Sequence, residues 1–147
     1  MIYSNINSQT LGFLGRALSL EMTAVQQYLT MSRLLKLRGF EEEAKSFQEE
    51  SQHEMEHVEQ IVNRMLVMGV APNATQLRPV RLGNSLPELI ANVQAMESEI
   101  VEFYKRAVAH CRDSNDFDNQ VFFEKLLKDE LEHVDSLEAW KGRYSKN

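Results

Sequence analysis

The chain has 147 residues, of which 43% are hydrophobic and 26% are charged, a composition that excludes disordered and collagen-like proteins. At this length we expect one domain, covering residues 1–147. With 6 Gly and 3 Pro, the chain has too few turn residues for a β-sandwich or β-barrel. The net charge of −6 argues against nucleic acid as a partner, because nucleic acid is also negatively charged, and favours cations instead.

The cysteine content and the N-terminal sequence bear on the location of the protein. The single cysteine, Cys111, excludes an intramolecular disulfide, is typical of a reducing compartment, and is expected in the core. The N-terminal residues lack the basic start and the apolar run of a signal peptide. No apolar stretch reaches the roughly 18 residues that a membrane-spanning helix needs. We therefore expect a cytoplasmic protein that has no membrane partner.

Apolar residues recur at spacings of three and four, the period of an amphipathic helix, in four stretches. Gly39 and Gly69 follow the first two stretches, as glycine commonly follows a helix C-terminus. Ser85 and Glu88 form a capping-box pattern at the start of the third stretch. The four predicted helices span residues 11–35, 41–68, 85–111 and 116–140.

The lengths of the connections predict how these helices are arranged. The connection 70–84 has about fifteen residues and includes Pro72, Pro79 and Gly83, whereas the other two connections are short. Short connections join antiparallel neighbours, and a long connection can cross the length of a bundle. We therefore predict an all-α fold, a ferritin-like four-helix bundle with a long crossover between the second and third helices.

An internal repeat with an offset of 76 residues relates the two halves of the chain. Within each half, 33 residues separate a glutamate on the first helix from the glutamate of an E-x-x-H motif on the second. Each half is therefore predicted to be a helical hairpin with the same three polar residues. The repeat aligns Glu21 with Glu97, Tyr28 with Tyr104, Phe47 with Phe123, Glu54 with Glu130, and His57 with His133.

The four repeated glutamates occupy helix positions where an apolar residue is expected, and each histidine follows one turn later on the same face. Burying unpaired carboxylates costs several kcal/mol each. Two divalent cations would balance four carboxylates, and Glu with His suits iron or manganese. A solvated acidic face is the alternative, but two motif copies in register argue against it. The predicted di-metal ligands are Glu21, Glu54, His57, Glu97, Glu130 and His133.

Four segments carry a resemblance to a known family, namely 18–28, 53–66, 96–104 and 129–138. Through them the chain resembles bacterioferritin over nearly its whole length. The resemblance implies that the six predicted ligands form a di-iron ferroxidase centre. Glu54 and Glu130 would bridge the irons, Glu21 and Glu97 would be terminal ligands, and each histidine would bind one iron.

The same resemblance implies a reaction and an assembly. Ferrous iron would be oxidised by dioxygen or peroxide, and ferric mineral would be stored in a homo-oligomeric shell, built from dimers and containing up to 24 subunits. Only 14 residues follow His133, too few for the fifth helix of the family, so the size of the oligomer stays open.

Met55 lies where bacterioferritins supply a haem ligand, so the resemblance implies haem b held by Met55 from each of two subunits. Because Met55 directly follows Glu54, its side chain is expected to point about 100° away from the bundle core. The alternative is a methionine packed at a helical interface. The acidic Glu56 is unfavourable for haem propionates, and both interpretations stay open.

Three other residues have two interpretations each. Tyr28 matches a family tyrosine near the di-iron centre, where it would donate an electron or a hydrogen bond, but it also suits the core. Glu49 and His53, beside Glu50, resemble an iron site on the inner wall of the shell. A solvated acidic face is the favoured interpretation of this cluster.

Iron storage with ferroxidase activity is the function that the sequence favours. The main alternative is another ferritin-like di-iron or di-manganese redox enzyme, a peroxidase or an oxygenase, because a fold does not fix a function. A non-enzymatic shell subunit would have lost ligands in one half, and all six ligand types are present here.

Overall fold

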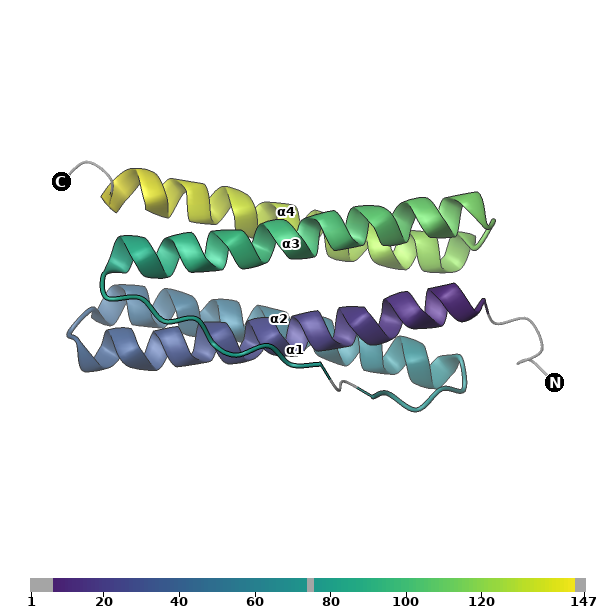
Figure 1. Cartoon of the computed structure of the whole chain (residues 1–147), viewed down its shortest axis with the longest axis horizontal. Coiled ribbons are helices and arrows are strands. Elements are labelled where there is room, and N and C mark those ends of the chain that lie inside the picture. The colour runs from purple at the N-terminus through teal and green to yellow at the C-terminus, as the bar shows by residue number, and fades with distance from the viewer. Residues whose placement is uncertain (1–6, 74–75, 145–147) are drawn as a thin grey trace. The chain divides into compact units, whose positions relative to one another are not determined.

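The computed structural model describes residues 7–73 and 76–144, and these residues form four helices and no strand (Figure 1). The helices confirm the predicted all-α class and lie close to the predicted ranges. The chain divides into two compact units, Met1–Val80 and Arg81–Asn147. A single domain over residues 1–147 stays a prediction. The helices are α1 (Ser8–Leu37), α2 (Glu41–Val67), α3 (Leu86–Asp113) and α4 (Phe117–Tyr144).

Each unit contains one antiparallel helical hairpin, α1–α2 in the first and α3–α4 in the second. The turns that connect the two helices of each hairpin have the same backbone conformation and the same hydrogen bond. After α1, Gly39 has a φ of +86° and Phe40 N–H donates to Leu35 O at 2.9 Å. After α3, Asn115 has a φ of +57° and Asp116 N–H donates to the Cys111 carbonyl at 2.8 Å. Glycine and asparagine are the residues that tolerate this left-handed conformation after a helix. The repeat therefore extends to the turns.

Helix α1 begins three residues before the predicted start because Asn7 caps it. The Asn7 side-chain oxygen accepts hydrogen bonds from the backbone N–H groups of Gln9, at 2.9 Å, and Thr10, at 3.1 Å. These bonds satisfy two of the donors that the first turn of a helix leaves open. The apolar stripe begins only at Leu11, so periodicity alone places the helix start too late.

The crossover between α2 and α3 is anchored at both of its ends and along α1. Gly69, with a φ of +78°, ends α2 as predicted. Within the first unit, Arg78 N–H donates to Thr23 Oγ1 of α1 at 3.3 Å. At the start of α3, Glu88 N–H donates to Ser85 Oγ at 3.3 Å, as in a capping box. The Glu88 carboxylate accepts from Asn84 N–H at 2.6 Å, one residue before the usual position.

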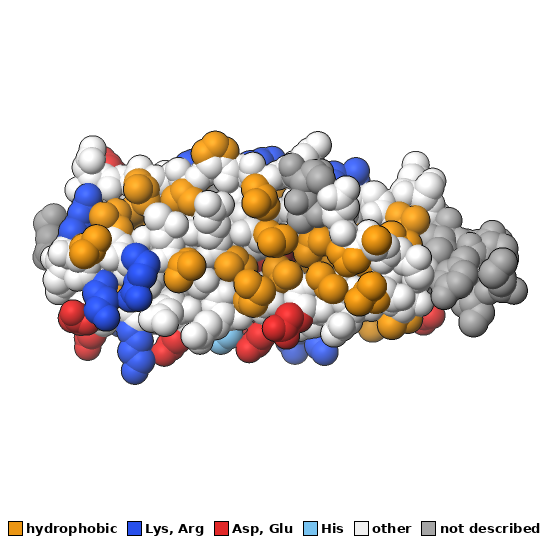
Figure 2. Space-filling model, turned by 90° about the horizontal axis from the view of Figure 1, so that it is seen from below, with side chains coloured by type: hydrophobic (Ala, Val, Ile, Leu, Met, Phe, Trp, Pro, Cys, Tyr) orange, Lys and Arg blue, Asp and Glu red, His pale blue; other side chains and the backbone are white. Residues whose placement is uncertain are grey.

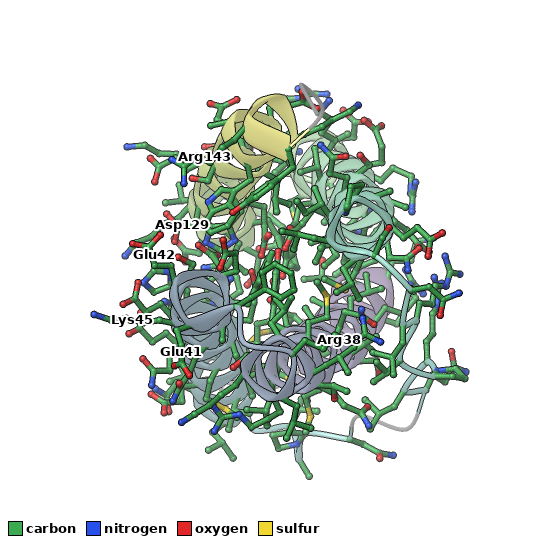
Figure 3. All side chains as sticks on the ribbon, turned by 90° about the vertical axis from the view of Figure 1, so that its left-hand side faces the viewer. Arg38, Glu41, Glu42, Lys45, Asp129 and Arg143 are labelled. Atoms are coloured by element: carbon green, nitrogen blue, oxygen red, sulfur yellow. The ribbon has the colours of Figure 1, made fainter. Side chains whose placement is uncertain are left out.

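Each hairpin has a buried apolar interior with a repeated aromatic pair. Tyr28 packs against Phe47 with ring centroids 6.0 Å apart, and Tyr104 packs against Phe123 at 6.1 Å. All four rings are buried, and so is Cys111, as predicted. Charged side chains such as those of Glu41, Glu42 and Lys45 extend outward from α2 (Figure 3). None of the described helices is long and apolar enough to cross a membrane.

Candidate metal centre

The first hairpin contains a buried half-site made of two carboxylates and one imidazole. Glu21 comes from α1, and Glu54 and His57 come from α2. His57 Nδ1 lies 3.4 Å from Glu21 Oε1 and 3.4 Å from Glu54 Oε2. Each of these residues offers a ligand atom within 4.8 Å of the others. The sequence predicted this grouping, which we call the first half-site.

The second hairpin contains the corresponding second half-site. Glu97 comes from α3, and Glu130 and His133 come from α4. His133 Nδ1 lies 3.3 Å from Glu130 Oε2, and the ligand atoms of the three residues lie within 4.8 Å of one another. The glutamates are fully buried, whereas the His133 side chain is 12% exposed. The two half-sites are therefore matched in residue type and in the distance between the glutamate and the histidine of each E-x-x-H motif.

Helical spacing explains how each half-site forms. The glutamate and histidine of each E-x-x-H motif are three residues apart, so they lie on one face of their helix. Glu21 lies on the buried face of α1 with Leu14, Leu18 and Tyr28. An apolar residue would bury more surface at this position without any cost of desolvating a charge. The sequence thus places a carboxylate where the fold itself needs a hydrophobic side chain.

The charge balance of the buried residues favours a bound cation. Four glutamates of the two half-sites are fully buried, and no Lys or Arg is buried in the part of the chain that the structure describes. Even if His57 and His133 were both protonated, the four carboxylates and two imidazolium groups would leave a net charge of −2. Carboxylate oxygens with one imidazole nitrogen form a donor set that suits iron or manganese. Each half-site is therefore chemically suited to one divalent metal ion.

Tyr28 and Met55 lie on different sides of the first hairpin. Tyr28 is buried two helical turns after Glu21 and contacts Phe47, so its place in the core is established. Its electron-donating role stays a prediction. Met55 is 41% exposed, whereas the preceding Glu54 is fully buried. A partner or a cofactor could therefore reach the Met55 thioether without disturbing the half-site.

On α2, Met55 is flanked by the exposed polar residues Gln52, Glu56 and Glu59. Hydrophobic side chains gather on the face of the molecule that is shown in Figure 2. Leu29 on α1 is 46% exposed. The repeat aligns Leu29 with Lys105, which is exposed and forms an ion pair with Glu102 at 3.1 Å. Gln26 aligns with Glu102 in the same comparison. The second hairpin thus carries charge at two positions where the first hairpin has uncharged side chains.

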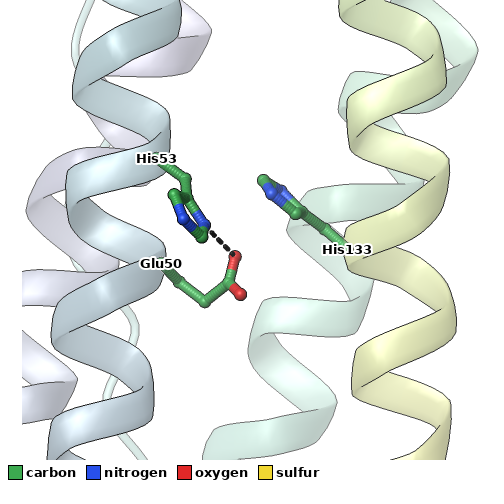
Figure 4. A group of neighbouring side chains, drawn as sticks. All are labelled: Glu50, His53 and His133. Atoms are coloured by element: carbon green, nitrogen blue, oxygen red, sulfur yellow. Dashed lines mark ion pairs between the residues drawn. The ribbon is translucent and has the colours of Figure 1, made fainter.

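The acidic cluster on α2 is more exposed than either half-site. His53 Nδ1 lies 3.9 Å from Glu50 Oε2, one turn away on the same helix (Figure 4). Glu49 and His53 are exposed. His133, also drawn in Figure 4, belongs to the second hairpin. A role for Glu49 and His53 in iron binding stays a prediction.

Comparison with known proteins places these observations in a family. The sequence-family model of the ferritin-like domain matches residues 12–146 of this chain. Bacterioferritin of Mycolicibacterium paratuberculosis is 35% identical over 131 residues, which cover 89% of this chain and 82% of that protein. Bacterioferritin of Rhodobacter capsulatus is 34% identical over 140 residues, which cover 95% and 87%.

A solved structure of Rhodobacter capsulatus bacterioferritin matches this chain with a TM-score of 0.92 and 33% identity, covering 97% of this chain and 89% of that one. That structure has a metal-free dinuclear site and a haem iron in a crystallographic special position. The match confirms the predicted ferritin-like four-helix bundle.

Proposed function

Because this chain belongs to the bacterioferritin family of ferritin-like proteins, we propose that it is an iron-storage ferroxidase that oxidises Fe²⁺ to Fe³⁺. The observation that carries the proposal is that both half-sites are complete, each with two buried carboxylates and one imidazole. Ferritin-like di-iron proteins combine one Glu from each of two helices with Glu-x-x-His from the other two. The proposed ligands of two irons are Glu21, Glu54, His57, Glu97, Glu130 and His133.

In this proposal the two irons are substrates that share one set of ligands. Glu54 and Glu130 bridge them, while Glu21 and Glu97 each bind one. His57 Nδ1 faces both carboxylates of its half-site, so Nδ1 is the nitrogen placed to bind iron. Two adjacent Fe²⁺ ions supply two electrons to one molecule of dioxygen or peroxide, which avoids a one-electron product.

The charge of the ligand set also indicates what the oxidised irons would require. Four carboxylates balance two Fe²⁺ ions when both imidazoles are neutral. Oxidation to two Fe³⁺ ions leaves a net charge of +2 in a buried site, where excess charge is costly. Hydroxide or water-derived anions are then favoured at the irons, and hydrolysis drives ferric iron toward mineral. The carboxylates thus favour the oxidation, and the transfer of ferric iron to mineral depends on these added anions.

We also propose that the outward α1–α2 face forms a dimer interface with haem b bound by Met55 from each subunit. The exposed thioether of Met55 supports this, and neutral sulfur ligands suit haem iron. Haem would supply a one-electron transfer site. Glu56, which is exposed beside Met55, is unfavourable for haem propionates. Larger shells, up to 24 subunits, would be built from this dimer.

The alternative di-iron or di-manganese peroxidase or oxygenase is not favoured, because the matched relatives are named bacterioferritin. A cytoplasmic location remains our proposal, since the lone cysteine is buried and suits a reducing compartment.

The experiment that tests the proposed function is aerobic titration of the metal-free protein with Fe²⁺. Ferric absorbance should develop fast up to two irons per chain. The double variant Glu54→Ala with His133→Ala should lose this fast phase. The matched control is Glu56→Ala with Glu132→Ala, a repeat-related pair that is exposed on the same two helices. Oxidation at the parent rate by the first variant would show that the site lies elsewhere.

A further inference from the structure

The stripe of α4 that carries the second half-site continues into two aromatic residues. Glu130, His133, Leu137, Trp140 and Tyr144 follow one another at spacings of three and four, so they fall within about 80° on one side of the helix. Trp140 lies seven residues after His133, which is about 10 Å along the helix axis. The stripe therefore leads from a proposed iron ligand to the end of the described helix.

Trp140 and Tyr144 are in contact with each other. Their ring centroids are 5.7 Å apart and the ring planes are inclined by 28°, so the rings are stacked. Both side chains are partly exposed, whereas Leu137, between Trp140 and His133, is buried. Indole and phenol are the two side chains that lose one electron most readily after the thiolate. An oxidisable, partly exposed pair thus lies on the same side of α4 as the ligands of the second half-site.

The internal repeat indicates that the scaffold does not require aromatic residues at these positions. Trp140 aligns with Arg64 of α2, and Tyr144 aligns with Met68. By contrast, Leu137 aligns with Ile61, and both are buried, as packing of the hairpin interior demands. The aromatic pair is therefore specific to the second hairpin, although the metal ligands are common to both.

We propose that Trp140 and Tyr144 are an electron-donor pair that reduces peroxide together with a single Fe²⁺ at the second half-site. This inference rests on the proposed ferroxidase function. The step is H₂O₂ + Fe²⁺ + Tyr–OH + H⁺ → Fe³⁺ + 2 H₂O + Tyr–O•. The iron supplies one electron, and the Tyr144 phenol supplies the second electron and a proton. The O–O bond breaks and both oxygens become water, so no hydroxyl radical is released.

In this step Trp140 passes the electron from Tyr144 to the iron site, and Arg143 favours transfer in that direction. Trp140 donates its electron first, because it lies nearer to His133, and Tyr144 then reduces it. The Arg143 guanidinium lies 5.3 Å from the centroid of the indole ring. Its positive charge disfavours a positively charged, oxidised indole. The electron deficit therefore moves to Tyr144, whose phenolic proton can pass to solvent because the residue is partly exposed.

The first test is electron paramagnetic resonance after one Fe²⁺ per chain is mixed with one equivalent of H₂O₂ and frozen. The parent should give a tyrosyl radical. Tyr144→Phe should leave an indolyl radical on Trp140, the only tryptophan of the chain. Trp140→Phe should lower the radical yield several-fold, and hydroxyl adducts of a spin trap should rise. The control Tyr104→Phe, which changes a buried tyrosine of the same hairpin, should keep the parent signal.

Three outcomes would overturn the proposal. Iron oxidation without an organic radical would refute the role of Trp140 and Tyr144 as electron donors and would leave the proposed ferroxidase function intact. A radical lost in Tyr104→Phe but kept in Trp140→Phe would assign the donor to the buried core. Absence of iron oxidation would overturn both proposals.

A second measurement uses Trp140 fluorescence and needs no turnover. Binding of Co²⁺ to the metal-free protein should quench the emission strongly, because the ion would lie within roughly 10–15 Å of the indole by helical rise. Glu130→Ala should remove the quenching, whereas the matched exposed control Glu132→Ala should keep it. Unchanged emission on Co²⁺ binding would contradict the close approach on which the relay depends.

Discussion

Replacing a terminal carboxylate by its amide should separate the stability of the metal-free protein from the stability that metal confers. Glu21→Gln and Glu97→Gln keep the shape of the side chain and remove one buried charge each. Since both glutamates are fully buried, their charged forms cost several kcal/mol of desolvation. The metal-free variants should therefore be at least as stable as the parent, unlike variants of ordinary packing residues.

The metal-bound proteins should show the opposite order. At free Co²⁺ about a hundredfold above the dissociation constant, each occupied site stabilises the fold by about 2.7 kcal/mol. Two sites give about 5 kcal/mol, or roughly 10–20 °C in melting temperature for a chain of this size. Each single variant should lose about half of this shift, because a terminal ligand serves one metal, and the double variant should lose nearly all of it.

Calorimetry with and without Co²⁺ measures both effects, and Glu56→Gln is the matched control because this glutamate is exposed on α2. A shift in Glu21→Gln equal to that of the parent would refute the role of Glu21 as a ligand. A large loss of stability in the metal-free variant would instead indicate that the carboxylate stabilises the fold through its own contacts.

Three other predictions address the turns, the haem and the dimer. Gly39→Ala should destabilise by about 1 kcal/mol in urea unfolding, because alanine is strained at positive φ, whereas Asn115→Gly should be neutral or stabilising. With added haem, the parent should show a low-spin bis-thioether spectrum at up to one haem per two chains. Met55→Leu should abolish this spectrum and leave iron oxidation intact. Equal haem binding by the variant would show that Met55 only packs at an interface. Leu29→Lys should shift native mass spectra toward monomer, while Leu131→Lys on the second hairpin should not; a parent that is strictly monomeric at micromolar concentration would exclude the dimer.

Periodicity and spacing could predict the helices and the composition of each half-site because both depend on local sequence. The E-x-x-H motif places its two ligands on one helix face wherever the helix forms, so the contacts of His57 with Glu54 and of His133 with Glu130 follow directly. The glutamate of the partner helix, such as Glu21, could be found because it occupies a helix position where an apolar residue is expected and because the repeat supplied a second copy of the same spacing.

Features that depend on backbone conformation or on rotamers could not be predicted in the same way. The left-handed Asn115 has the role of Gly39, but asparagine is also common in other turns, so its position alone is not diagnostic. The Glu88 carboxylate accepts a hydrogen bond from the backbone N–H of Asn84, whereas in the usual capping box it would accept from the N–H of the N-cap residue, Ser85. The stacking of Trp140 on Tyr144 requires particular side-chain torsions that a helical wheel does not specify.

The most direct test of the central claim is the location of iron in crystals of this protein. Crystals soaked with Fe²⁺ and measured at the iron absorption edge should show two anomalous peaks per chain. One should be bound by His57 with Glu21 and the other by His133 with Glu97, and Glu54 and Glu130 should contact both. Iron found only at exposed carboxylates such as Glu49, or a single peak held by one hairpin, would contradict the di-iron centre.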